Sequence, residues 1–119
     1  MEPISNGMEE NFPVKTPSER QEKVNERLRR LAADFLEIES NKTSLITVTR
    51  ADASKDLKRA TLFITVLPES REEQAILFAR RKSGEFRDYV KSKMKMRIIP
   101  FFTFEIDKGE KTRRKIDEL

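Results

Sequence analysis

The sequence predicts an α+β two-layer sandwich, with a three-stranded sheet and helices packed on one face of it. Two observations predict this class. Apolar residues recur every three or four positions in several segments, which indicates helices. Three short runs either alternate apolar with polar residues or are rich in β-branched residues, which indicates strands. The predicted order is helix, strand, strand, helix, bend, helix, strand, the type II KH-like order. A chain of 119 residues is the size of one domain.

The first helix is expected to run from residue 16 to about Glu39. Thr16 is expected as its N-cap, Pro17 as its first helical residue and Glu19 as the partner that completes a capping box. Residues 1–15 show no periodicity and are expected to form a disordered tail, so the domain is predicted over 16–119. The apolar face of this helix comprises Val24, Leu28, Leu31, Phe35 and Ile38.

Two strands are expected next, "SLITVTRA" (44–51) and "ATLFITVL" (60–67). In the second, Leu62, Ile64 and Val66 share one face because side chains alternate along a strand. The linker "DASKDLK" is short enough for an antiparallel hairpin. Asp56 is expected to cap its turn through the carboxylate, with Leu57 packed beneath.

A bent pair of helices is expected between Pro68 and the last strand. Ser70 and Glu73 could form a second capping box, Gly84 could break or bend the helix, and Ser83 could cap the helix that follows. The residues expected to face the core are Ala75, Ile76, Phe78 and Ala79 in the first helix and Phe86, Tyr89 and Val90 in the second.

The third strand is predicted in "RIIPFFTFEID" (97–107), where Phe102, Phe104 and Ile106 alternate with the residues between them. Pro100 cannot donate to a strand ladder, so it indicates an edge strand or a bulge. Arg97 and Asp107 could pair across the fold. The terminal "KGEKTRRKIDEL" is expected to be a short, frayed helix.

Composition excludes much chemistry. The chain has no Cys and no His, so disulfides, thiolate or imidazole metal sites and the commonest general base are excluded, and no metal or cofactor is expected. No apolar run is long enough to span a membrane, and the amino terminus lacks a secretory pattern. We therefore expect a cytoplasmic protein that has no membrane partner.

Positive charge is concentrated in "RRKSGEFRDYVKSKMKMR" (80–97), which has eight Lys or Arg against two acids, a net +6 in a chain of net +4. A solvated basic helix face is the simpler interpretation, but solubility is better served by interspersed signs. Clustered cations instead favour nucleic acid, because they neutralise phosphates and release counterions. A helix beginning near Gly84 would add backbone amides of Gly84, Glu85 and Phe86 as an anion site.

Exposed aromatic residues on the open sheet face are a second possible contact for RNA. Phe63 and Phe101 could stack on bases there, although a strand Phe more often belongs to the core. The Gly-x-x-Gly clamp typical of KH domains is absent, since the glycines are Gly7, Gly84 and Gly109.

The sequence resembles the ribosome-binding factor A family over roughly residues 18 to 118. The resemblance lies in "VTRADASKDLKRATLFITVL", "KSGEFRDYVKSKMKMR" and "MRIIPFFTFEID". The chain departs from the family pattern in having Lys82-Ser83-Gly84 where Ala-x-Gly is usual, and "SNKT" where Asp-Pro usually precedes the first strand.

This resemblance implies a KH-like fold and a non-catalytic role in late maturation of the small (30S) ribosomal subunit, through contact with ribosomal RNA, together with a role in growth in the cold. It implies that Ser83 and Gly84 shape the bend and that Arg87 lies on the helix after it. No small-molecule substrate is expected, and the chain is expected to be a monomer. From charge or resemblance, the candidate RNA-binding residues are Arg80, Arg81, Lys82, Ser83, Gly84, Arg87, Lys91, Lys93 and Lys95.

Two other classes of function remain open. A protein-interaction adaptor could use the same basic face to dock an acidic partner, or the chain could bind RNA without a ribosomal role. An enzyme would need paired carboxylates or a lysine. The acids near one another in sequence, Glu37 with Glu39 and Asp117 with Glu118, do not face each other on a helix.

Overall fold

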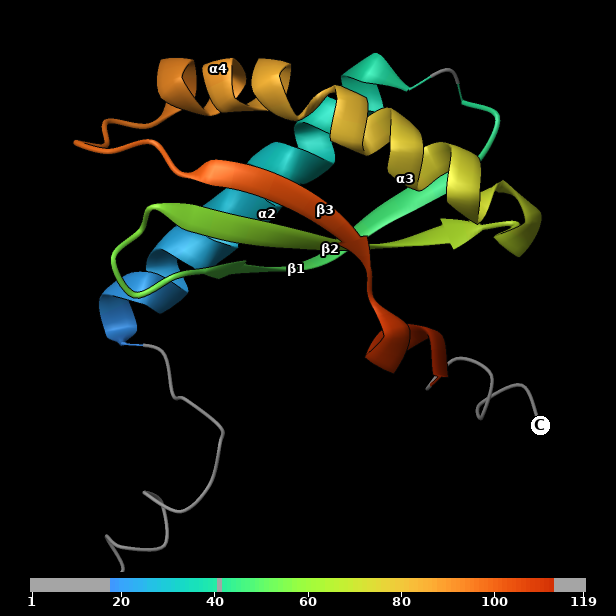
Figure 1. Ribbon diagram of the computed structural model, residues 1–119, viewed down its shortest axis with the longest axis horizontal. Helices are drawn as coiled ribbons and strands as arrows, with labels where there is room; N and C mark the ends of the chain where they lie inside the picture. Colours follow the sequence, from blue (N-terminus) through green and yellow to red (C-terminus); the bar gives the residue numbers. More distant parts are fainter. Residues whose placement is uncertain (1–17, 41, 113–119) are drawn as a thin grey trace, which may run out of the picture.

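The computed structural model describes residues 18–40 and 42–112. Its order matches the predicted one (Figure 1). The elements are α2 (Glu19–Glu39), β1 (Leu45–Ala53), β2 (Arg59–Leu67), the 3-10 turn η1 (Glu69–Arg71), α3 (Glu72–Arg81), α4 (Ser83–Lys93) and β3 (Phe101–Ile106). Residues 108–112 are also helical, whereas the expected tail and the rest of the expected terminal helix lie outside the described residues.

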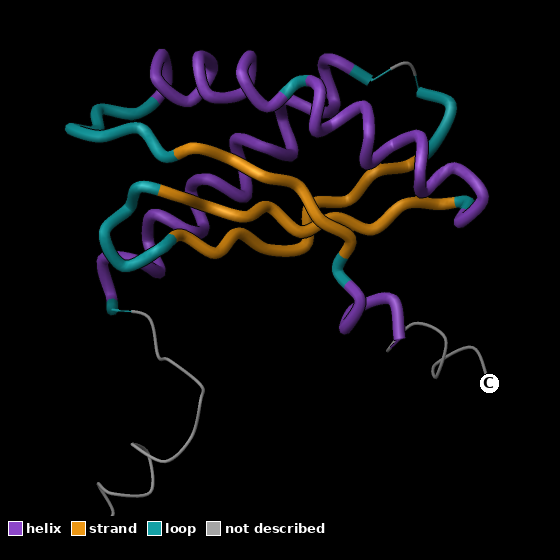
Figure 2. The backbone as a smooth tube through the Cα atoms, in the orientation of Figure 1, coloured by secondary structure: helices purple, strands orange, loops and turns teal. Residues whose placement is uncertain are grey.

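The sheet has the order β1-β2-β3, with β1 and β2 antiparallel and β2 and β3 parallel. A parallel pair needs a long crossover, and η1, α3 and α4 supply it, so these helices lie over the sheet (Figure 2). The predicted α+β sandwich is confirmed. As the sequence predicted from Pro100, β3 is an edge strand, although it begins at Phe101 rather than at residue 97.

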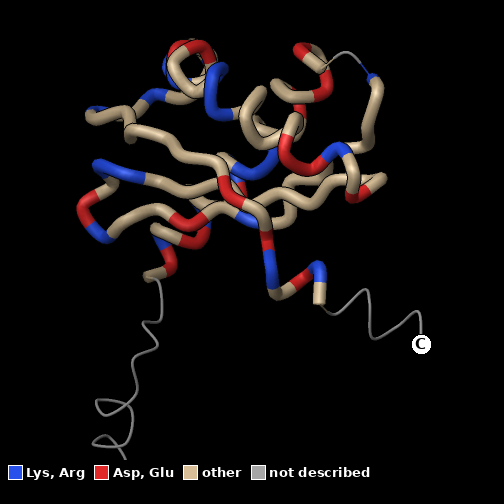
Figure 3. The backbone as a smooth tube through the Cα atoms, turned by 45° about the vertical axis from the view of Figure 1, so that its right-hand side comes forward, with Lys and Arg blue, Asp and Glu red and all other residues tan. Residues whose placement is uncertain are grey.

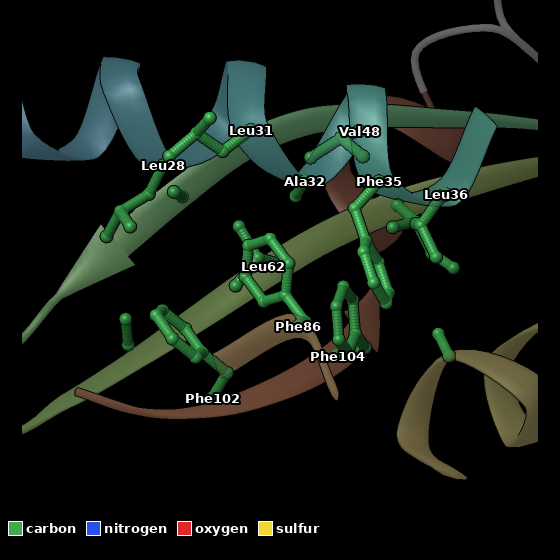
Figure 4. Close-up of a cluster of buried hydrophobic side chains, with 14 of the residues drawn as sticks. Leu28, Leu31, Ala32, Phe35, Leu36, Val48, Leu62, Phe86, Phe102 and Phe104 are labelled. Carbon is green, nitrogen blue, oxygen red and sulfur yellow. The ribbon is translucent and has the colours of Figure 1, made fainter. Parts of the chain in front are cut away.

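The core lies between the helices and one face of the sheet, and an aromatic cluster is at its centre (Figure 4). Phe86 of α4 is fully buried, with ring centroids 5.4 Å from Phe35 of α2, 4.7 Å from Phe102 and 5.8 Å from Phe104 of β3. The alternation predicted for β2 and β3 is confirmed. Ile38, which was expected on the apolar face of α2, is exposed instead.

Two predicted helix caps are wrong. The N-cap of α2 is Ser18, whose hydroxyl accepts from the Gln21 amide at 3.1 Å in a capping box, while Thr16 and Pro17 lie outside the described residues. The capping box of Ser70 and Glu73 does not form, because Ser70 lies inside the turn η1. There the Arg71 amide donates to the Pro68 carbonyl, and α3 starts without a side-chain cap.

The hairpin turn forms as predicted. The Asp56 carboxylate accepts from the Ser54 hydroxyl at 2.7 Å and from the Lys58 amide at 3.0 Å, and these bonds lower the pKa of Asp56. Leu57 has a positive φ of 61° and packs against the core. The turn therefore fixes where β2 begins.

Asp107 links the two outer strands of the sheet. The register of β1 shifts between Val48 and Arg50, and the Thr49 hydroxyl there donates to the Asp107 carboxylate. Asp107 also accepts from the Glu110 amide at 3.0 Å, and its charged partner is Arg50, 3.6 Å away. The predicted pair with Arg97 is wrong, because the bulge brings Arg50 to this carboxylate instead.

Burial raises the pKa of Asp107, but the hydrogen bonds from Thr49 and Glu110 and the charge of Arg50 outweigh it, so the net pKa is lowered. The ionised carboxylate therefore stabilises the fold above the pKa of the unfolded chain, about 3.9. That contribution is lost as the pH falls through the lower folded pKa.

We predict that Asp107→Asn is less stable than the wild type at neutral pH by about 1 kcal/mol. Asparagine has nearly the same shape and can still accept from the Glu110 amide, but it lacks the negative charge. Between pH 5 and pH 3 the variant should lose less stability than the wild type, because it has no carboxylate to protonate at this position. Urea denaturation from about pH 7 down to pH 3 measures both effects. Parallel pH profiles for the two proteins would contradict the assignment.

Candidate nucleic-acid interface

The bend between α3 and α4 lies at Lys82, immediately before the Ser83-Gly84 pair at which it was predicted. Lys82 has φ −92° and ψ 4°, and its amide donates to the carbonyls of Phe78 and Ala79, both at 3.1 Å. Ser83 is the first residue of α4 and makes no capping hydrogen bond, so its predicted role as a cap is wrong. The backbone passes from one helix to the next with little interruption, which leaves no place for a side-chain cap.

Gly84 lies in the first turn of α4 and does not itself break the helix. Its φ is not positive, it is exposed, and a Cβ built on it would meet nothing within 4 Å. Neither backbone conformation nor internal packing therefore requires glycine here. The lack of a side chain leaves the backbone of the bend open to close approach from outside.

The predicted anion site at the start of α4 is reduced by contacts within the chain. The Phe86 amide donates to the Lys82 carbonyl at 2.8 Å, so it is not available to a ligand. The carboxylate of Glu85 stands in the first turn and bonds to the Lys82 ammonium at 3.3 Å. Any phosphate contact at the bend must therefore come mainly from side chains.

Two of the eight clustered cations hold the edge of the sheet. The Phe101 amide donates to the Lys58 carbonyl just before β2, and the Asp107 amide donates to the Ile64 carbonyl of β2. The odd-numbered residues of β3 therefore bond to β2. The carbonyls of the even-numbered residues point away from β2. Arg80 reaches the Phe104 carbonyl on that outer edge at 3.1 Å. Arg87 reaches the Pro100 carbonyl at 3.1 Å and the Ile99 carbonyl at 2.9 Å.

A third cation is paired within the chain. The Lys82 ammonium lies 3.4 Å from Glu39 of α2 and 3.3 Å from Glu85 of α4, and its side chain is 29% exposed. The hydrogen bond to Glu85 is the larger cause of a raised Lys82 pKa, and the interaction with Glu39 raises it further. This cation therefore connects the bend to the end of α2.

The remaining cations of the segment face solvent. Arg81, Lys91, Lys95 and Arg97 are exposed, and their side chains make no ion pair or hydrogen bond with any described residue. Lys93 lies over the Tyr89 ring at 5.6 Å, and its charge remains accessible. Within α4, Gly84, Asp88 and Lys91 recur at intervals of four and three and therefore share one face, on which Asp88 is the acidic member.

A further group of cations was not among the predicted site residues. Lys55, Lys58 and Arg59 lie in or beside the β1–β2 turn, are exposed and make no side-chain ion pair with a described residue. The excess of Lys and Arg in residues 40–68 was the available signal. Figure 3 shows the basic positions spread over helices and strand ends with acids between them, so the basic residues are not confined to the bend.

The described residues offer little for other chemistry. None of the helices in residues 18–40 and 42–112 is both long and apolar enough to cross a membrane. No group of three or more acidic residues in this part of the chain is arranged to hold a metal ion.

The sequence model of a family described as "Ribosome-binding factor A" matches residues 20–119. Ribosome-binding factor A of Staphylococcus epidermidis is 31% identical over 107 residues, covering 84% of this chain and 92% of that protein. The protein of the same name from Fervidobacterium nodosum is 34% identical over 77 residues, and that match spans 64% of this chain and 62% of the relative.

Solved structures of similar fold carry the same name. A crystal structure of ribosome-binding factor A from Thermus thermophilus superposes with a TM-score of 0.66 at 21% identity, covering 72% of this chain and 93% of that one. A homology model of the Thermus thermophilus factor has been fitted into a cryo-electron microscopy map of a 30S complex. It superposes with a TM-score of 0.59 at 22% identity, covering 66% of this chain and 86% of that one.

We predict that Arg87→Met lowers the free energy of unfolding by about 1.5 to 3 kcal/mol, because it removes two charged donors and leaves carbonyls at the sheet edge without them. Arg81→Met is the matched control, since Arg81 is exposed and unpaired among the described residues. It should change stability by no more than about 0.5 kcal/mol. Equal losses for the two variants in urea denaturation would show that Arg87 does not hold the edge.

Proposed function

Because the chain belongs to the ribosome-binding factor A family, we propose that it binds ribosomal RNA of the precursor small ribosomal subunit and assists the late maturation of that subunit. The related Thermus thermophilus factor has been placed in a 30S complex, which supports the small subunit as the partner. On this proposal the protein acts in the cytoplasm as a monomeric, non-catalytic factor and contributes to growth in the cold.

The observation that carries this proposal is the set of exposed cations along the bent helix pair and in the loop after it whose side chains have no described ion pair or hydrogen bond. Arg81, Lys91 and Lys95 keep their charge available, and Lys93 adds to it. Exposed Lys and Arg contact phosphates without reading base sequence, so this surface would recognise the backbone of folded RNA. Arg80, Lys82 and Arg87 would serve mainly to hold the helix pair in place.

We predict that Arg81→Glu, Lys91→Glu and Lys95→Glu together abolish association with free small subunits. Three phosphate-facing cations become anions, while no described contact within the fold is lost. Sedimentation of lysate through a gradient measures the shift of the protein from the small-subunit peak to the top. Nuclease treatment of the same lysate distinguishes binding to RNA from docking on an acidic protein.

A control with the same change in net charge separates a local effect from general repulsion. Arg20, Lys23 and Lys108 are exposed, away from the bend, and without a described ion pair. Their triple replacement by Glu should leave the protein with the small subunits. If the bend variant stays folded and still co-sediments, the proposal is wrong.

We also predict that Gly84→Ala has opposite effects on stability and binding. Alanine favours a helix over glycine by up to about 1 kcal/mol, and the added Cβ meets nothing in the fold, so the variant should unfold at higher denaturant concentration. Association with small subunits should weaken, because the methyl group obstructs close approach of an RNA backbone. Binding equal to that of the wild type would remove Gly84 from the interface.

A further inference from the structure

Phe101 is a large aromatic side chain left in solvent on the first residue of β3. It is 69% exposed and belongs to the open face of the sheet, opposite the core-facing Phe102. The other large hydrophobic residues exposed to a comparable degree are aliphatic. Phe101 contributes little to the core, and its exposure has no explanation in the packing of the described residues.

The Phe101 ring is held in place by the arginine that secures the sheet edge. The Arg87 guanidinium carbon lies 4.5 Å from the ring centroid, while its nitrogens bond to the carbonyls of Ile99 and Pro100. A guanidinium held by two carbonyls cannot move away from the ring without losing both bonds. One face of the ring is therefore covered by a fixed cation, and the high exposure requires the other face to be open.

Two cationic residues without described ion pairs neighbour Phe101. Arg59 is the cross-strand partner of Phe101, and the Phe101 amide donates to the Lys58 carbonyl at 2.9 Å. The nearby carboxylate of Asp56 is already occupied by the Ser54 hydroxyl and the Lys58 amide. The β1–β2 turn and the loop before β3, which carries Arg97, lie at the same end of the molecule (Figure 2).

We propose that Phe101 is a stacking platform for an unpaired RNA base, with Arg59 and Lys58 contacting the phosphates on either side of that nucleotide. An open aromatic face beside unpaired cations is the combination that single-stranded nucleic acid selects, because every base has a π-face and every nucleotide a charge. This inference rests on the proposed RNA-binding function and adds to it a second surface, distinct from the bend, that requires unpaired RNA.

The test compares two RNA probes with the full-length protein at fixed low salt: a short oligouridylate and an RNA duplex of the same length. Phe101→Ala should weaken oligouridylate binding roughly 5- to 150-fold, the range for loss of one base stack, and leave duplex binding unchanged. Phe101→Tyr should bind both as the wild type does. Leu45→Ala, which removes a 61% exposed side chain from the start of β1, is the control and should change neither.

A direct spectroscopic signal is available because the chain contains no tryptophan. In Phe101→Trp the indole fluorescence reports on this position alone, and stacking of a base should quench it on addition of oligouridylate but not of duplex. Thermal unfolding of each variant shows whether a loss of binding follows from a loss of fold. If Phe101→Ala misfolds, the tryptophan variant still decides the question.

The outcomes separate this inference from the proposed function. If the bend variant loses the small subunit while Phe101→Ala binds oligouridylate normally, the stacking site is wrong and the function stands. If Phe101→Ala weakens subunit association but not oligouridylate binding, Phe101 contacts a protein and the inference is overturned. Absence of quenching in Phe101→Trp at saturating oligouridylate would overturn it as well.

Discussion

The outer edge of β3 is the constraint on which the helix pair depends. Arg80 and Arg87 are seven residues apart, about 10.5 Å along a helix, and the carbonyls of Pro100 and Phe104 are four residues apart, about 13 Å along a strand. The two spacings agree to a few ångströms, so one helix face can satisfy both carbonyls across a bend at Lys82. An exposed strand edge would otherwise invite pairing with another chain.

Because those arginines hold the edge, neighbouring positions of the helix pair can carry other charges. Arg81, Gly84 and Lys91 are exposed, while Arg80 and Arg87 bond to carbonyls at the edge of β3. Lys82 fixes the same bend from the side of α2 through Glu39. A single basic segment thus divides into cations that maintain the fold and cations that remain available to a partner.

The sequence predicts elements better than it predicts contacts. Periodicity reports burial directly, which is why the strands and the core positions of α3 and α4 were predicted. The predicted caps at Ser70 and Ser83 were wrong because capping depends on the backbone conformation of a single residue. Ser70 lies inside a 3-10 turn, and Ser83 lies where one helix passes almost directly into the next. The division of the basic cluster could not be predicted, since Arg80 and Arg87 bond to carbonyls that lie 24 and 13 residues further along the chain.

The two proposed surfaces differ in what they can recognise, and Arg87 connects them. Cations along α4 neutralise phosphates of any RNA and give no selectivity between paired and unpaired bases. A stacking site at Phe101 accepts only a base that is out of its helix. Arg87 extends from α4 around the edge of β3 to the Phe101 ring, so an RNA that contacts both surfaces must cross this edge. Such a chain would pass from a folded region to an unpaired one. The combination would therefore favour junctions between helical and single-stranded RNA, and pairing of the stacked base would weaken binding without any change in the protein.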